Sequence, residues 1–490
     1  MADPTEQSNR SDDARRARAV RDLLIDAGFS SPRMNVLNPR GYYVTNFARS
    51  LGASDTLIGL LTAVASLASL SQLGASYIIE RVRRTKPLCV TARLLSRLLW
   101  PLVLGLCFAP FLSFRWRIYA LILGGGLVQM LQSAAYVSWL SWVKDLIPQQ
   151  VRGAFLGLRG MWMNLVAVVT ALGVAQAIDT YSARAGGGGV AGAMDVPQAF
   201  FWPFMTVVGL ALLGTVFLFR VPEAPMVEVA HRPPFSQLLR EALADRNLRL
   251  LLISHVLWLG SARLVQPFLA LFLRQELGLR FLVIQGLEVL MRLTNSAQQR
   301  WWGPMADRFG NRPVLLLAQS MMATTALLWI GVNHHTLWAL LPLIFIIRGT
   351  AGAGLQLSRS NLILSLSPEE NPSIYIAAFN SLASLATFVV PLFGGGLLDG
   401  LKGAHLSLGS LAVTGLQALL AVNFLMRAVA IWLLRGVSEE NSRGVRHFAQ
   451  AMARSHSRNP VALMMRAADA PRRLRHWRAR LRRRRRRRRR

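Results

Sequence analysis

Apolar stretches, each long enough to cross a membrane as a helix, recur along most of the chain, and short charged segments separate them. A helix needs about 20 mostly apolar residues to span the hydrocarbon core of a bilayer. Hydrophobic residues make up 53% of the sequence and charged residues 16%. Soluble domains usually carry about 25% charged residues. The pattern therefore predicts an all-α polytopic membrane protein.

The apolar stretches predict twelve transmembrane helices. We expect them at residues 25–48, 56–79, 88–111, 117–140, 154–178, 199–219, 250–274, 281–302, 313–333, 337–357, 373–398 and 410–434. The first of these is the least apolar, because it contains Asp26, Arg33 and Arg40 as well as Pro32 and Pro39.

Internal repetition supports the first helix. Leu51-Gly52 recurs as Leu277-Gly278, at an offset of 226 residues. Residues 153–179 and 373–399 run in parallel at an offset of 220, and both segments end in aspartate. Duplicated halves are a recurrent plan in secondary transporters. The offset of 226 places a helix at 26–48, so we expect two pseudo-symmetric six-helix halves.

This repetition defines the expected organisation of the chain. It comprises a polar N-terminus (1–24), an N-terminal half (25–219), a proline-containing linker (220–249), a C-terminal half (250–435) and a basic tail (436–490). The arginine-rich and lysine-rich loops fall on one side of a twelve-helix layout, with Arg115 and Arg117 as the exception on the other side, and positive loops face the cytoplasm. We therefore expect a multi-pass protein of the bacterial inner membrane with both termini in the cytoplasm.

A short motif lies between the second and third helices of the second half. It consists of Gly303, Asp307, Arg308, Gly310 and Arg312. The first half has a degraded copy with Glu80, Arg81 and Arg84, and the turn after the fourth helix carries Asp145 and Arg152. This pattern resembles the signature loop of the major facilitator superfamily.

The resemblance implies a gating role for these residues, as a latch that joins the two halves on the cytoplasmic side. Gly310 allows a sharp turn with positive φ. The Asp307 carboxylate is expected to pair with Arg312 or to face the positive N-terminus of a neighbouring helix. The alternative interpretation is that these charges only fix the orientation of the chain in the membrane.

Ionisable side chains inside the expected spans indicate where a solute passes, because such groups normally face a cavity or a partner. Asp26, Arg33 and Arg40 are spaced seven apart and are expected on one face of the first helix. The resemblance implies that helices one, four, seven and ten line the central path. The candidate residues of the substrate path are then Arg33, Arg40, Arg263, Gln266 and Arg348.

The positive sign of this set favours an anionic substrate that carries a carboxylate or a phosphate. Pairing between helices and snorkelling near helix ends are the alternative roles for these arginines. Asp26, His255 and Glu288 are the candidates for proton coupling. Glu288 and Arg292, four residues apart, are also expected to form a structural ion pair, and a lone histidine is often a packed core residue.

The resemblance implies transport of a small solute by alternating access. Two alternatives stay open: a lipid or lysolipid flippase on the same fold, and a membrane scaffold or sensor that transports nothing. We find no phosphate-binding Gly-Lys-Ser/Thr loop, nucleophile elbow or His–Glu metal motif, so we expect no enzyme activity, cofactor or metal site. We expect the chain to act as a monomer.

The C-terminal tail is strongly basic and ends in nine consecutive arginines, from Arg482 to Arg490. Such a run repels itself and does not fold alone. On the cytoplasmic side it is expected to contact anionic lipid headgroups. A low-complexity extension without a role and contact with nucleic acid are the alternatives.

Overall fold

The structure is a computed structural model, and it describes residues 4–82, 84–147, 149–185, 196–223, 240, 244–366, 372–401, 406–408, 411–413 and 415–439. The arginine tail lies outside these residues. The N-terminal half contains α1 (Pro4–Val36), α2 (Tyr42–Ser50), α3 (Asp55–Ala68), α4 (Ser71–Val82), α5 (Thr85–Phe108), α6 (Phe114–Leu146), α7 (Gln149–Ala185) and α8 (Gln198–Arg220).

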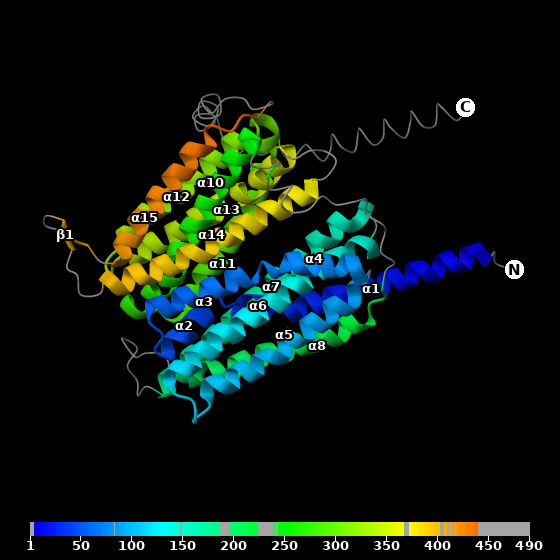
Figure 1. The fold of residues 1–490 in the computed structure, drawn as a ribbon, viewed down its shortest axis with the longest axis horizontal. Helices are drawn as coiled ribbons and strands as arrows, with labels where there is room; N and C mark the ends of the chain where they lie inside the picture. The colour runs from blue at the N-terminus through cyan, green and yellow to red at the C-terminus, as the bar shows by residue number, and fades with distance from the viewer. Residues whose placement is uncertain are drawn as a thin grey trace.

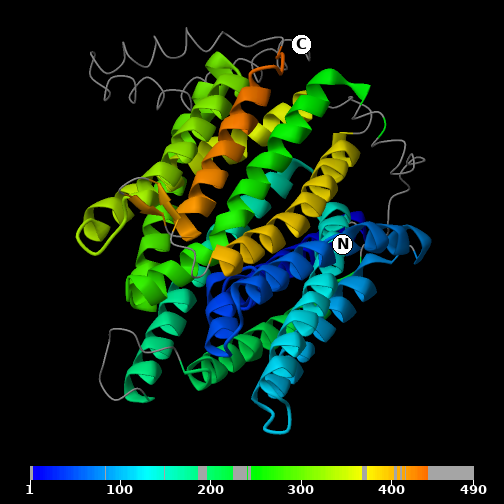
Figure 2. The same ribbon diagram turned by 60° about the vertical axis from the view of Figure 1, so that its left-hand side comes forward.

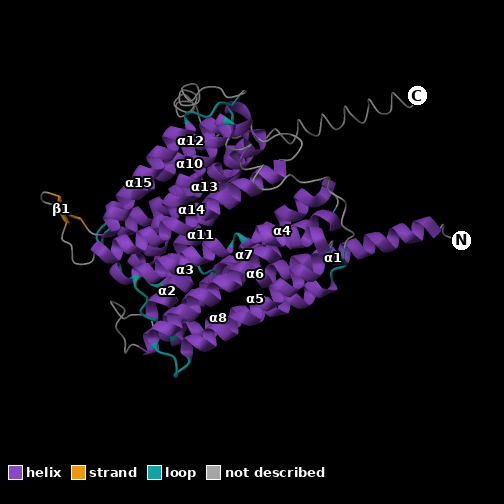
Figure 3. Cartoon of the chain, in the orientation of Figure 1, coloured by secondary structure: helices purple, strands orange, loops and turns teal. Residues whose placement is uncertain are grey.

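The C-terminal half contains α10 (Arg246–Leu271) with the π-helical turn η1 (Phe272–Glu276), α11 (Phe281–Phe309), α12 (Asn311–Ile330), α13 (Leu337–Leu366), α14 (Pro372–Leu401), a short hairpin of β1 (Leu406–Leu408) and β2 (Leu411–Val413), and α15 (Gly415–Leu434). Helices dominate the molecule, as Figure 3 shows. In Figure 1, α1 begins and α15 ends at the same end of the bundle. We call the opposite end, next to β1, the distal end.

Each of the twelve expected spans overlaps a helix of the described residues. By length and composition, nine helices in this part of the chain are apolar enough to cross a membrane. The first two spans are each divided, into α1 and α2 and into α3 and α4. The last helix begins at Gly415 rather than at residue 410, because the hairpin occupies part of the expected span.

The sequence repeat is reproduced in the backbone. Gly52 and Gly278, which the offset of 226 relates, both adopt positive φ, at 80° and 63°. Each glycine follows the last turn of a membrane helix and turns the chain toward the next one. Arg49 and Gln275, related by the same offset, meet each other at 3.3 Å between Nε and Oε1. The pseudo-twofold axis that relates the halves therefore passes close to these two side chains, at the distal end of the bundle.

The two halves pack against each other through two symmetric helix pairs. The pairs are α3 with α14 and α7 with α11. Figure 2 shows α14 alongside α3. Inside each half, apolar side chains fill the spaces between helices, and aromatic rings such as Phe47, Phe200 and Phe204 contact one another.

A buried ion cluster holds the N-terminal half together. Asp26 on α1 is fully buried and accepts from Arg93 Nη1 at 2.5 Å and Arg97 Nη2 at 3.4 Å, both on α5. Arg97 also donates to Ser30 Oγ at 2.6 Å and to the Ala211 carbonyl on α8. The sequence placed these charges in separate helices without showing that they meet.

Replacing Asp26 by Asn is expected to destabilise the protein by about 3–5 kcal/mol, because it leaves two buried arginines without their counter-charge. The matched control is Glu223→Gln, which changes an exposed carboxylate just after α8 in the same half. An exposed charge contributes little. Chemical unfolding in detergent micelles measures both variants. Equal stability of Asp26→Asn and Glu223→Gln would contradict a stabilising role for the cluster.

Candidate functional site

A cavity of about 320 Å³ lies between the two halves, near the middle of the bundle. The N-terminal half contributes the segment from Asn35 to Thr45, and the C-terminal half contributes residues of α10, α11, α12, α13 and α15. Ligand pockets usually measure about 300–1,000 Å³. The cavity is therefore of a size that suits a small molecule.

A break in the first membrane span forms one wall of this cavity. Helix α1 ends at Val36 and α2 begins at Tyr42. Between them, Asn38 Oδ1 accepts from the Arg40 backbone N–H at 3.1 Å, and the Asn38 carbonyl accepts from Gly41 at 2.7 Å. Pro39 has no N–H to continue a helical ladder. Discontinuous helices commonly form the substrate sites of transporters, and here the break places Arg40 and Gly41 on the wall.

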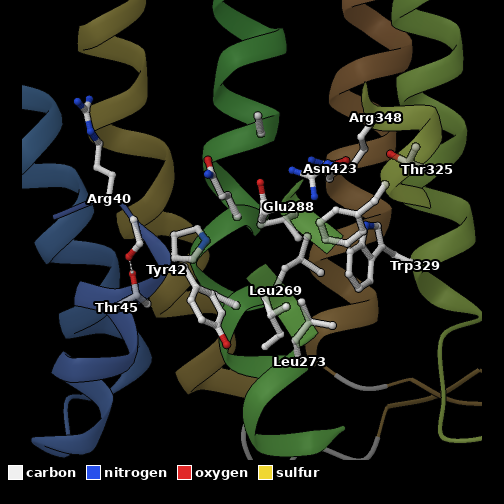
Figure 4. A pocket seen from close by; sticks show the side chains of 18 of the residues that line it. Arg40, Tyr42, Thr45, Leu269, Leu273, Glu288, Thr325, Trp329, Arg348 and Asn423 are labelled. Atoms are coloured by element: carbon white, nitrogen blue, oxygen red, sulfur yellow. Dashed lines mark hydrogen bonds between the residues drawn. The ribbon is translucent and has the colours of Figure 1, made fainter. Parts of the chain in front are cut away.

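Charged side chains on the wall are mostly basic. They are Arg40, Arg292, Arg348, Arg427 and Glu288. Figure 4 shows Glu288 in the middle of the labelled set, with Arg40 on one side and Arg348 and Asn423 on the other. The aromatic side chains of Tyr42 and Trp329 also face this space.

Two of these arginines are held by their surroundings. Arg427 Nη1 donates to the Met322 carbonyl at 2.5 Å, and its guanidinium lies 5.1 Å from the Trp258 ring centroid. Arg292 Nη2 donates to Asn35 Oδ1 at 2.8 Å and so connects α11 to α1 of the other half. The expected ion pair between Glu288 and Arg292 is not formed in the described structure, because Arg292 points toward Asn35.

The other three charges have no polar partner among the described residues. The guanidinium of Arg40 and the carboxylate of Glu288 make no hydrogen bond or ion pair there, and Arg348 only lies over the Phe345 ring, at 5.0 Å. A charged group inside a membrane protein normally pairs with another group or faces water. Arg40, Arg348 and Glu288 are thus available to a ligand.

The residues expected on the substrate path separate into three groups. Arg40, Gln266 and Arg348 lie on the cavity wall. Arg263 donates to Gln266 Oε1 at 2.9 Å and lies next to the wall. Arg33 donates to Gln132 at 2.6 Å and is 8% exposed, away from the cavity. The prediction that Arg40 shares one helical face with Asp26 and Arg33 was wrong, because α1 ends before Arg40.

The three expected proton-coupling residues occupy different surroundings. Asp26 is enclosed by Arg93 and Arg97 and does not line the cavity. His255 lines a separate cavity of about 20 Å³ with Gln319 and Arg359. Glu288 alone of the three lines the central cavity.

The motif of the second half forms the turn between α11 and α12. Gly310 has φ 94° and ψ 161°, as its position in the turn requires. Arg312 donates to the Arg435 carbonyl, and the Glu439 carboxylate accepts from the Asn311 and Arg312 backbone N–H groups at 3.0 and 2.8 Å. These contacts join α12 to the end of α15 within one half.

The remaining gating candidates lie on the surface, inside a helix or outside the described residues. The turn places Arg308 on the surface, with its guanidinium 5.3 Å from the Phe309 ring centroid. Arg81 and Arg84 are exposed as well, and Gly303 lies inside α11. The side chains of Asp307, Glu80, Asp145 and Arg152 lie outside the described residues, so their role as a latch stays a prediction.

Two aspartates close the distal end between the halves. Asp179, at the end of α7, accepts from the Phe281 and Leu282 N–H groups at the start of α11, at 3.0 and 2.9 Å. Asp399, at the end of α14, accepts from the Thr56 N–H and hydroxyl at the start of α3, at 2.7 and 2.5 Å. A carboxylate at a helix N-terminus satisfies free N–H groups and interacts favourably with the helix dipole.

This distal closure, formed by Asp179 and Asp399, is symmetric. The two aspartates are the ends of the repeated segments, and they cap helices that the offset of 226 relates. Asp179 also lies 3.3 Å from Arg274 Nη1. The sequence repeat marked both residues, but it could not show that each one contacts the opposite half.

Asp179→Asn and Asp399→Asn are expected to weaken the distal closure and to expose the cavity at the distal end. A cysteine at Ala262, on the cavity wall, then reacts faster with a membrane-impermeant thiol reagent applied from the distal side. We expect an increase of about fivefold or more, since each charged hydrogen bond contributes about 1.5–3 kcal/mol.

The matched control for this labelling is Asp245→Asn. Asp245 caps α10 within one half by accepting from the Leu248 N–H at 2.7 Å. Its loss removes a helix cap but no contact between the halves, so the labelling rate at residue 262 is expected to stay unchanged. Equal rates in all three variants would show that the carboxylates do not close this end.

Comparison with known proteins agrees with this architecture. The family model of the Major Facilitator Superfamily matches residues 41–293 and 251–486. No curated protein matches the sequence. Among solved structures, a bacterial homologue of the human lysosomal transporter Spinster, in an inward-facing and unoccupied conformation, covers 86% of this chain and 95% of its own, with a TM-score of 0.59 and 14% identity.

A second similar structure is the nucleoside transporter NupG. It covers 86% of this chain and 98% of its own, with a TM-score of 0.61 and 12% identity. At such identities the likeness shows the fold alone.

Proposed function

The chain belongs to the Major Facilitator Superfamily, and from this premise we propose that it carries a small anionic solute across the membrane by alternating access. It is a multi-pass membrane protein with a transporter fold. The observation that carries the proposal is the cavity between the halves, where Arg40 and Arg348 have no polar partner among the described residues.

The energetic argument concerns arginines inside the membrane. On insertion scales, an arginine at the centre of a membrane helix costs about 2.5 kcal/mol or more. Arg33 and Arg427 offset this cost through hydrogen bonds within their own halves. Arg40 and Arg348 gain no such compensation from the described residues. A bound carboxylate or phosphate supplies the acceptor oxygens that a guanidinium fork fits.

Access to the cavity is proposed to alternate between the two ends of the bundle. With both termini in the cytoplasm of a bacterium, the distal closure faces the outside of the inner membrane. The described state is then closed to the outside by Asp179 and Asp399. The motif around Asp307 is proposed to form the corresponding latch at the cytoplasmic end in the opposite state.

Glu288 is proposed as the group that couples transport to protons. It is a carboxylate on the cavity wall, and the described residues give it neither a cation nor a donor. Protonation removes its negative charge and so makes the cavity more attractive to an anion. A gradient of protons or of the substrate itself supplies the energy.

The cavity also bears on the two alternative functions. Its volume of about 320 Å³ and its charged wall favour a small solute over a lipid or lysolipid. A scaffold has no need of charged groups without partners in its interior.

The arginine tail is proposed to hold anionic lipid headgroups, which contribute about 1 kcal/mol per residue near the surface.

Small anions are expected to raise the thermal unfolding midpoint of the purified protein. A ligand that binds only the folded state stabilises it by about 2.7 kcal/mol at a hundredfold excess over its Kd. The shift is expected to disappear when Arg40→Gln and Arg348→Gln are combined and to persist in Arg115→Gln, which changes an exposed arginine at the start of α6. Shifts with sugars, cations or lipids but with no anion would overturn the proposal.

A further inference from the structure

We propose that the substrate carries two separate anionic groups joined by a short neutral spacer, an inference that rests on the proposed anion transport and makes it more specific. The reason is the distribution of charge on the cavity wall. Two arginines without a polar partner among the described residues, Arg40 and Arg348, lie on opposite sides of Glu288 (Figure 4), whereas Arg292 is held by Asn35. We call the two sides the Arg40 pole and the Arg348 pole.

The Arg40 pole consists of Arg40, Arg263 and Gln266. Arg40, from the helix break of the N-terminal half, shares the cavity wall with Gln266 on α10, which Arg263 contacts. Gln266 accepts the hydrogen bond of Arg263 and itself lines the cavity. Arg40 is left without an acceptor among the described residues, so this pole presents a free guanidinium beside a second positive charge.

The Arg348 pole consists of Arg348, Arg427 and Asn423. Arg348 on α13 and Arg427 on α15 line the same cavity wall. The hydrogen bonds of Arg427 go to the Met322 carbonyl and to Ser261, and Asn423 donates to the Ser261 carbonyl. The protein thus fixes Arg427 and Asn423 but leaves the Arg348 guanidinium without an acceptor in this part of the described chain.

Glu288 lies between the two poles, as Figure 4 shows. Its carboxylate repels an anionic group placed in the centre of the cavity and therefore favours anionic groups at the two ends. Four arginines and one glutamate line the wall, an excess of three positive charges. A monoanion neutralises one pole and leaves the other, whereas a dianion gives each pole an acceptor.

The surroundings limit the spacer. Leu269, Leu273 and Trp329 face the space near Glu288, and the nearby Arg292 already donates to Asn35, so the middle of the cavity offers apolar contact. The volume of about 320 Å³ is at the low end for ligand pockets. A chain of a few carbon atoms between the anionic groups fits these limits, which describes a small dicarboxylate or a phosphorylated carboxylate.

The test compares matched monocarboxylates and dicarboxylates at pH 7, where both carboxylates of a simple diacid are ionised. The probes are butyrate against succinate, pentanoate against glutarate and hexanoate against adipate, with Kd measured by calorimetry on the purified full-length protein. The dicarboxylate of at least one pair is expected to bind about tenfold or more tightly, because a second charged hydrogen bond contributes about that factor.

Two single variants then test whether each pole binds one anionic group of the dicarboxylate. In Arg40→Gln and in Arg348→Gln the advantage of the dicarboxylate is expected to fall below about twofold, while the monocarboxylate still binds at the remaining pole. Neither side chain has a hydrogen bond to lose among the described residues, so both variants are expected to fold, and their unliganded unfolding midpoints check this. Arg115→Gln, far from the cavity, is expected to keep the full advantage.

The outcomes separate this inference from the proposed function. Equal affinity within every matched pair would overturn the inference of two anionic groups and leave anion transport standing. A dicarboxylate advantage that persists in both single variants would overturn the two-pole assignment. If none of these carboxylates binds and no small anion raises the unfolding midpoint, the proposed function fails, and the inference fails with it.

Discussion

Charge inside a membrane protein must be matched, and this constraint explains the contacts that the buried arginines Arg33, Arg93, Arg97 and Arg427 make in the described bundle. Asp26 offsets Arg93 and Arg97 in the N-terminal half, and backbone carbonyls accept from Arg97 and Arg427. Arg33 donates a hydrogen bond to the amide oxygen of Gln132. The central cavity departs from this rule, because Arg40, Arg348 and Glu288 lack polar partners among the described residues. A functional site is where such a departure is expected.

The same two halves that share the cavity also meet at the distal closure. Both contacts there consist of a carboxylate at the end of one helix and the free N–H groups at the start of another. In the proposed alternating access these contacts break when the halves rotate. Arg292 and Asn35 also link the halves next to the cavity, so the proposed rotation changes contacts beside a bound ligand.

The sequence predicted the architecture well, because hydropathy and internal repetition report directly on membrane spans. The offset of 226 predicted a helix at 26–48, where the structure has the end of α1 and the start of α2, and the turn at Gly310 adopts the positive φ expected of it. The break between Val36 and Tyr42 was not anticipated. Pro39 gave a signal for it, but a proline inside a membrane helix often only bends the helix.

The site was predicted in part. Arg40, Gln266 and Arg348 were named, and they lie on the cavity wall. Arg292 was expected only as the ion-pair partner of Glu288, and neither it nor Arg427 was assigned to the cavity, because a linear pattern does not fix how far each helix is rotated about its axis. Arg33 illustrates the reverse, since it belongs to a helix at the cavity but points toward Gln132. The distal closure could not be predicted from the sequence for a similar reason, because it depends on which helix ends meet.

The most direct test of the central claim is the charge displaced when an anion enters the cavity. Proteoliposomes adsorbed on a solid-supported membrane give a transient current after a rapid anion concentration jump. We expect a current with at least one small carboxylate or phosphorylated carboxylate for the unchanged protein, and none for Arg40→Gln combined with Arg348→Gln. A current of equal size in the double variant, or no current with any anion, would contradict an arginine-lined pathway for anions.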